Sequence, residues 1–152
     1  MSLINHSFTF GEIDFGKILT KLIQTDTITD IMLWENEIWV TDIVKGHYRY
    51  EAKKASKEDL KQLEELLYKI PRQIAIRMQV AYNEGSPLLD GEALLENGQL
   101  RISAIHESLC GGIYPGIALR KTRYRLRISE KMMVEEGFAD QNFINLLKIY
   151  SP

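Results

Sequence analysis

The sequence contains a single cysteine, Cys110, among its 152 residues. One thiol cannot form an internal disulfide, and this suits a reducing compartment such as the cytoplasm. No apolar run approaches the roughly 20 residues that a membrane-spanning helix needs, so the sequence predicts a soluble domain. The phosphate-loop pattern Gly-x-x-x-x-Gly-Lys-Ser/Thr is also missing. We therefore do not expect this chain alone to hydrolyse a nucleotide.

Neither sign of charge is in excess, because 19 Lys and Arg residues stand against 21 Asp and Glu residues, for a net charge of −2. This balance argues against a dedicated nucleic-acid-binding protein, which is normally basic. The hydrophobic content of 45% and the charged content of 26% are typical of globular domains. The length suits one domain with its own core.

Two short segments of alternating polarity each present an arginine. An Asn-Gly turn dipeptide precedes residues 99–105, in which apolar and polar residues alternate and Arg101 takes a polar position. Residues 117–121 form a second such segment, in which Arg120 takes a polar position. The pattern predicts two strands that carry Arg101 and Arg120 on polar faces.

The remaining pattern predicts an α+β fold. β-rich runs predict strands over 30–34, 37–42 and 47–51, the first two joined by a tight hairpin turn. Apolar residues at helical spacing predict helices over 15–24, 57–69 and 72–82. Pro71 is predicted to separate the last two helices, because the residue before a proline disfavours helical backbone. We expect a mostly antiparallel sheet of about five or six strands with these helices packed on it.

Four short polar residues are placed where they can cap predicted helices. Asp14 and Ser56 are predicted to cap the first and second helices. Ser129 and Asp140 are predicted to cap two more helices, which form a C-terminal helical tail. The predicted domains are therefore an N-terminal α+β domain over 1–128 and a helical connector over 129–152.

Three motifs together resemble the N-terminal domain of the type II and type IV secretion ATPases. These are Pro-Leu-Leu-Asp-Gly at 87–91, Leu-Arg-Ile-Ser-Ala-Ile at 100–105 and Gly-Ile-Ala-Leu-Arg-Lys at 116–121. Such ATPases are hexameric and power pilus assembly, conjugation and protein export. The chain departs from the family pattern at Glu96-Asn97, where Pro-Asp is usual, and in the loop 106–112, which lacks paired prolines.

The resemblance implies a domain that forms one ring of a homo-hexamer and moves against a RecA-like motor. Arg101 and Arg120, assisted by Lys121, would contact the terminal phosphate of ATP, which the motor holds with Mg²⁺. The guanidinium group suits this role, because it is always charged and offers phosphate a planar fork of donors. The chain ends before such a motor, so we expect a domain cut from a longer protein and inactive alone.

The same resemblance implies partners and a location. The partners would be the protein's own motor domain, the neighbouring subunits and the membrane components of a secretion system. The protein would be cytoplasmic, with peripheral contact at the inner face of the membrane. A nucleic-acid partner is not expected.

Alternatives remain for each basic residue. The alternative for Arg101 and Arg120 is that both are ordinary strand arginines, paired with acidic neighbours on a solvent-exposed face. The basic run 120–127 would also suit binding to nucleic acid or anionic lipid, although a linker strand facing acidic residues of a motor is the favoured explanation. A second hypothesis for the whole chain is a stand-alone adaptor that binds protein or nucleic acid through this run. Trp34 and Trp39 are expected to pack on the sheet, and exposure of either would indicate a contact with a subunit or partner.

No catalytic residue and no metal site is predicted. Ser108 and Cys110 lack a nucleophile-elbow motif and a recognisable base. His6, His47, His106 and Cys110 lack the paired spacing of a structural zinc site.

Overall fold

The computed structural model describes residues 7–51, 55–123 and 129–150. The chain divides into two compact units, Met1–Thr122 and Arg123–Pro152. The predicted boundary at 128/129 borders residues 124–128, which lie outside the described part. Within the described residues, no helix is both long enough and apolar enough to cross a membrane.

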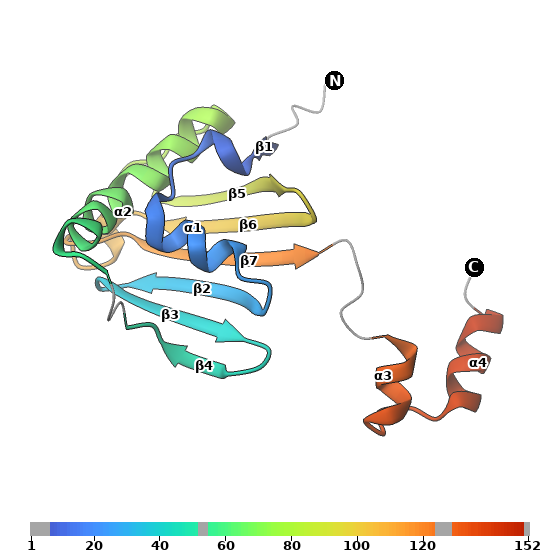
Figure 1. The fold of residues 1–152 in the computed structure, drawn as a ribbon. Coiled ribbons are helices and arrows are strands. Elements are labelled where there is room, and N and C mark those ends of the chain that lie inside the picture. The colour runs from blue at the N-terminus through green and yellow to red at the C-terminus, as the bar shows by residue number, and fades with distance from the viewer. Residues whose placement is uncertain (1–6, 52–54, 124–128, 151–152) are drawn as a thin grey trace, which may run out of the picture. The chain divides into compact units, whose positions relative to one another are not determined.

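The first unit is built on one mixed sheet with the strand order β1-β5-β6-β7-β2-β3-β4 (Figure 1). Its seven strands within the described residues are β1 (Ser7–Thr9), β2 (Ile28–Trp34), β3 (Glu37–Asp42), β4 (Gly46–Arg49), β5 (Leu88–Leu95), β6 (Gly98–Ile105) and β7 (Gly116–Arg123). The predicted α+β class is confirmed.

The predicted sheet, mostly antiparallel with five or six strands, is corrected to a mixed sheet with seven. β1 runs parallel to β5, with Phe8 opposite Ala93, whereas β2, β3 and β4 pair antiparallel. Sequence pattern missed β1 and β5 for local reasons. β1 has only three residues, and β5 contains Gly91, which strands disfavour.

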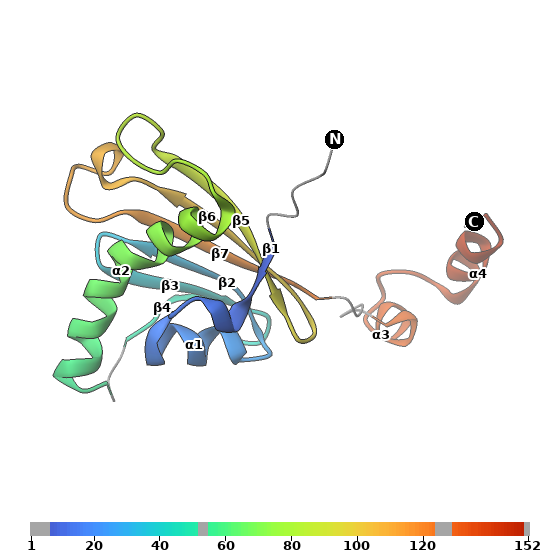
Figure 2. The ribbon, with the colours of Figure 1, turned by 90° about the horizontal axis from the view of Figure 1, so that it is seen from above.

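The helices α1 (Gly16–Gln24) and α2 (Lys57–Met78) cover one face of the sheet (Figure 2). The core lies between them and the apolar side of the strands, and includes Leu19, Ile74, Leu100, Ile102 and Leu119. Gly91 lets α2 approach closely, because a Cβ atom there would lie 2.8 Å from the Met78 Sδ atom and 3.0 Å from the Ile74 Cγ2 atom. A glycine that weakens the strand pattern therefore serves helix packing.

The predicted helix break at Pro71 is wrong, because α2 continues through this residue. Proline removes one backbone donor and crowds the preceding turn, which favours a break when nothing else intervenes. Here Pro71 is buried with Ile70 and Ile74 against the core, and the Arg72 Nη1 atom donates a 2.9 Å hydrogen bond to the Tyr68 carbonyl oxygen. Packing of this segment against the core therefore outweighs the local preference for a break.

The predicted hairpin between β2 and β3 is confirmed. Glu35 and Asn36 form its turn, with φ angles of 50° and 65°. Two consecutive residues with positive φ match the twist of a two-residue hairpin. The predicted cap of α2 is also present, because the Ser56 Oγ atom accepts the Asp59 N–H at 3.1 Å.

The second unit contains α3 (Glu130–Glu135) and α4 (Gln141–Tyr150). Ser129 Oγ accepts the Met132 N–H at 3.2 Å, and Asp140 Oδ1 accepts the Phe143 N–H at 2.8 Å. Both residues therefore cap these helices as predicted. Two 3₁₀ turns, η1 (Phe10–Glu12) and η2 (Glu107–Leu109), belong to the first unit.

Candidate functional site

Neither α1 nor α2 covers the second face of the sheet, which we call the open face (Figure 2). Residues alternate between the two faces, so the neighbours of the buried Leu100, Ile102 and Leu119 point to this side. Arg101 of β6 and Arg120 of β7 are both exposed there. The structure thus brings the two predicted arginines to the same face.

The two arginines also line the same hollow, of about 430 Å³, which we call the arginine hollow. Its walls come from β2, β3, β4, β6 and β7, and include Asp30, Trp39 and His47. The hollow therefore combines two cationic side chains with one acidic side chain and two aromatic rings. A phosphate group offers a matching charge for its arginines.

Arg120 is held by Asp30, which lies directly opposite it in the register of β2 and β7. The Arg120 Nε atom donates a 2.6 Å hydrogen bond to Asp30 Oδ1. This hydrogen bond, and the charge of Asp30, raise the pKa of Arg120 above its usual value. The other carboxylate oxygen of Asp30 accepts a 2.6 Å hydrogen bond from Thr29 Oγ1. The Arg120 side chain nevertheless remains 72% exposed.

Arg101 differs, because its guanidinium has no hydrogen bond or ion pair to any described residue. Glu92 of β5 lies opposite it in the register. Described residues therefore fix the guanidinium of Arg120 in the arginine hollow but not that of Arg101.

An aromatic pair forms the far wall of the hollow. The rings of Trp39 and His47 stack with centroids 5.5 Å apart and an interplanar angle of 13°. His47 Nδ1 lies 3.1 Å from Thr41 Oγ1, and Trp39 Nε1 donates to Glu37 Oε2 at 3.2 Å. These bonds and the stack fix both rings on the open face.

Lys121 lies on the other face of the sheet and is buried. Its Nζ atom donates to the carbonyl oxygens of Ile23, at 2.8 Å, and Thr25, at 2.5 Å. The predicted assistance of Lys121 in nucleotide contact stays a prediction, and this position does not favour it. The structure separates Lys121 from the two arginines that the sequence grouped with it.

Apolar side chains share the open face with the arginine hollow. Trp34 is 43% exposed and Met32 is 51% exposed. The Trp34 ring lies against Gly116, where a Cβ atom would come within 2.9 Å of it. Sequence reasoning expected Trp34 to pack on the sheet, and it does so at Gly116 while the residue remains partly exposed.

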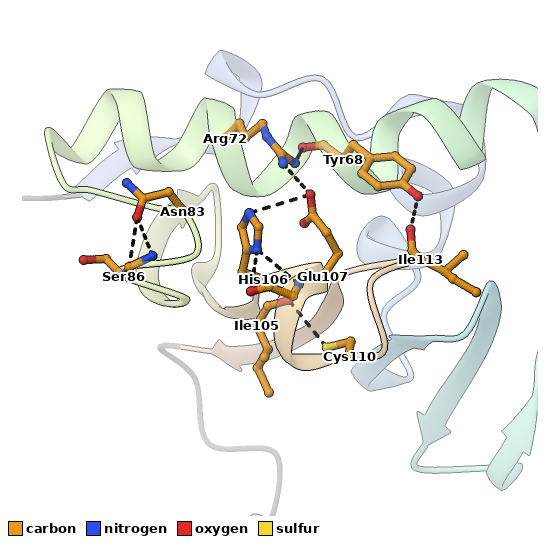
Figure 3. Close-up of polar contacts among 11 residues, drawn as sticks. Tyr68, Arg72, Asn83, Ser86, Ile105, His106, Glu107, Cys110 and Ile113 are labelled. Carbon is orange, nitrogen blue, oxygen red and sulfur yellow. Dashed lines mark hydrogen bonds and ion pairs between the residues drawn. The ribbon is translucent and has the colours of Figure 1, made fainter.

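The loop between β6 and β7 is fastened to α2 (Figure 3). The Arg72 Nη2 atom lies 2.5 Å from Glu107 Oε1, and Tyr68 Oη donates to the Ile113 carbonyl oxygen. Burial, the largest single influence, opposes ionisation of Glu107, but the hydrogen bond from Arg72, a backbone hydrogen bond and the charge of Arg72 together outweigh it, so the pKa of this carboxyl lies below its usual value. These contacts position the loop that leads into β7.

The same loop brings a histidine close to a serine, which sequence reasoning did not anticipate. His106 Nδ1 lies 2.9 Å from Ser108 Oγ, and His106 Nε2 lies 3.6 Å from Glu107 Oε1 (Figure 3). His106 Nδ1 also accepts the Ser108 backbone N–H at 3.2 Å, which makes the ring a cap of η2. Because the nitrogen that would act as a base already has this donor, we assign the arrangement a structural role.

Other predicted features fall partly outside the described residues. Of the basic run 120–127, residues 124–127 lie outside the described part, as does the side chain of Arg123. His6 also lies outside it. The described part of the chain shows no cluster of three or more His, Cys, Asp or Glu residues placed to hold a metal ion.

Comparison with solved structures shows a likeness of fold, whereas comparison of sequences does not. No protein-family model matches the chain, and no curated protein matches it. The structure resembles that of the VirB11 ATPase from the Brucella suis type IV secretion system in complex with sulphate, with a TM-score of 0.52 and 18% sequence identity. The match covers 81% of this chain and 33% of that one, so the chain spans about a third of its relative's length. This likeness shows that the chain shares the fold of part of a type IV secretion ATPase.

Proposed function

We propose that this chain is the N-terminal domain of a secretion ATPase, and that Arg101 and Arg120 contact a nucleotide held by a motor domain. The observation that carries the proposal is the convergence of both arginines on one hollow of the open face. In the whole protein, ATP and Mg²⁺ would bind to the motor, and the arginines would reach the terminal phosphate. Lys121 is left out of this contact because it is buried on the opposite face.

The chemistry of the hollow supports this role. Two guanidinium groups can share the charge of a γ-phosphate, and their contacts disappear when that phosphate leaves. Such a pair would couple the presence of ATP to the position of the domain. The exposed Trp34 and Met32 on the same face would meet the motor or a neighbouring subunit, since exposed apolar groups are typical of interaction surfaces.

The fold likeness supports the wider assignment. The protein that shares this fold is named as a type IV secretion ATPase, and this chain matches about a third of its length. By analogy, the whole protein would assemble as a homo-hexamer and couple ATP hydrolysis to export, conjugation or pilus assembly. Its partners would be the membrane components of a secretion system, with peripheral contact at the inner face of the membrane.

The test uses the whole protein that contains this chain. The reading frame after Pro152 is read first for Gly-x-x-x-x-Gly-Lys-Ser/Thr, and ATP hydrolysis is then measured for wild type, Arg101→Ala and Arg120→Ala. We expect each variant to lose about tenfold or more in turnover, because charge stabilisation by one arginine has effects of that order or larger. Size-exclusion chromatography checks that the variants assemble like wild type.

Arg49→Ala is the matched control. Arg49 is also a strand arginine, it pairs with Glu37 at 2.9 Å, and it is not among the residues that line the arginine hollow. Its replacement should leave turnover within about twofold of wild type, as expected for a surface ion pair. A reading frame without a motor, or full activity of Arg120→Ala, would support the stand-alone adaptor instead.

A further inference from the structure

The two arginines of the hollow are not equivalent, because among the described residues only Arg120 has a partner that fixes its guanidinium. Asp30 accepts from its Nε atom at 2.6 Å. No hydrogen bond joins the Nη atoms of Arg120 to a described residue. The described residues therefore leave the edge of the guanidinium that carries both Nη atoms available to a ligand.

Asp30 is itself held on more than one side. Thr29 Oγ1 donates to its Oδ2 atom at 2.6 Å, and β2 lies between β3 and β7 within the sheet. The register places His47, Thr41, Asp30 and Arg120 in one row across four strands. Asp30 lies inside this row and has little rotational freedom. It can therefore fix the direction of the longer Arg120 side chain.

We propose that Asp30 is a positioning residue, which holds Arg120 through Nε so that its Nη edge faces the γ-phosphate. This inference rests on the proposed function. Phosphate binds best to two parallel N–H donors, and a guanidinium already oriented loses less freedom on binding than a mobile one. Asp30 would therefore favour the contact although its own charge opposes a phosphate nearby.

Orientation of Arg120 by Asp30 and repulsion of phosphate by Asp30 would change ATP turnover in opposite directions. If Asp30 positions Arg120, its removal lowers ATP turnover. If Asp30 only neutralises Arg120 until a ligand arrives, its removal strengthens anion binding and raises turnover or leaves it unchanged. The two roles therefore predict opposite effects of one substitution.

The first experiment is a double-mutant cycle in the whole protein, with turnover at saturating ATP as the readout. We expect Asp30→Ala to lose about two- to tenfold, and Asp30→Asn to retain more activity because its amide oxygen can still accept the Nε–H. In an Arg120→Ala background, Asp30→Ala should cause no further loss. Asp90→Ala is the control, because Asp90 is another carboxylate of the open face, which accepts a 2.6 Å hydrogen bond from Ser103 Oγ and has no hydrogen bond or ion pair with either arginine.

The outcomes separate the two proposals. Unchanged turnover in Arg120→Ala overturns the proposed function and this inference with it. A loss in Arg120→Ala combined with unchanged or raised turnover in Asp30→Ala overturns the inference alone. Full additivity of the two substitutions also overturns it, because a positioning residue acts only through the group that it positions.

A second measurement needs no variant and so cannot fail through misfolding. In ¹⁵N-edited NMR spectra of the wild-type chain, the Nε–H of Arg120 should exchange with water about tenfold more slowly than that of Arg49. Arg49 is a suitable reference because its Nη2 atom, not Nε, contacts Glu37. Equal exchange of the two Nε–H groups would overturn the inference.

Discussion

The ammonium group of Lys121 caps the C-terminal end of α1. Its Nζ atom donates to the carbonyl oxygens of Ile23 at 2.8 Å and Thr25 at 2.5 Å, and the side chain is buried. The last carbonyls of a helix have no partner within it and carry partial negative charge. Lys121 of β7 therefore supplies hydrogen-bond donors to carbonyl groups at the end of α1, and this contact joins α1 to β7.

We predict that Lys121→Met lowers the stability of the domain. Methionine keeps the apolar stem but leaves buried carbonyls without their donor, which costs about 1–3 kcal/mol in the free energy of unfolding. Urea unfolding followed by circular dichroism measures the change. The control is Lys69→Met, which removes a surface ion pair of 3.8 Å with Glu65 and should cost less than about 0.5 kcal/mol. Equal stability of the two variants would contradict the capping role.

Helix caps and the faces of strands could be predicted from the sequence, because both depend on residues that are close in the chain. Ser56, Ser129 and Asp140 cap helices because a short polar side chain reaches the free N–H groups of the first turn. Alternation along each strand was enough to place Arg101 and Arg120 on a polar face. These features require only residues close in sequence.

Contacts between distant segments could not be predicted in this way. Asp30 and Arg120 are 90 residues apart, and their ion pair depends on β2 lying beside β7. The continuous α2 depends on burial of Pro71 against the sheet, which outweighs a local preference for a break. Only the arrangement of strands shows that the two arginines share one hollow and that Lys121 does not.

We predict that Gly16→Ala destabilises the domain more than Gly46→Ala does. Both glycines have positive φ, of 69° and 80°, so alanine is strained at either position. A Cβ atom at Gly16 would also overlap the Leu66 Cδ1 atom of α2, whereas nothing lies within 4 Å of one at Gly46. Overpacking typically costs about 1–3 kcal/mol, and this should be the difference between the variants. Thermal unfolding of both proteins measures it, and equal melting temperatures would show that α1 and α2 adjust freely.

We predict that removing the hydroxyl of Tyr82 does not destabilise the domain. This buried Oη atom has no hydrogen-bond partner among the described residues. Tyr68→Phe is the matched comparison, because Tyr68 Oη donates to the Ile113 carbonyl oxygen. Tyr82→Phe should therefore be neutral or stabilising, whereas Tyr68→Phe should lose about 0.5–1.5 kcal/mol in the free energy of unfolding. Urea unfolding of both variants measures the difference, and a clear loss in Tyr82→Phe would reveal a partner for its hydroxyl.

The same tyrosine should affect stability at high pH. Burial, followed by the charge of Glu107, raises the pKa of Tyr82 to about 12. A raised pKa means that the unfolded chain releases the proton first, so this contribution to stability is lost as pH rises from about 10 towards about 12. Tyr82→Phe lacks this proton and should show a smaller decrease in melting temperature over that range.

We predict that the stability supplied by Asp42 depends on pH in the acidic range. Asp42 Oδ1 accepts the Val44 N–H at 2.8 Å and the Lys45 N–H at 3.1 Å, and Oδ2 accepts from Thr27 Oγ1 at 2.8 Å. The bond from Val44 contributes most to holding the pKa of this carboxyl below its usual value. A lowered pKa means that the stabilisation is complete above the unfolded pKa of about 3.9 and is lost as pH falls through the folded pKa.

Asp42→Asn should therefore lower the melting temperature most at neutral pH, because the amide accepts fewer hydrogen bonds than the carboxylate and carries no charge. The difference from wild type should shrink below about pH 4, where the unfolded chain takes up the proton that the folded carboxylate resists. Melting temperatures of both proteins between pH 7 and pH 2 measure this. A difference of constant size would mean that the turn between β3 and β4 depends on the shape of the side chain and not on its charge.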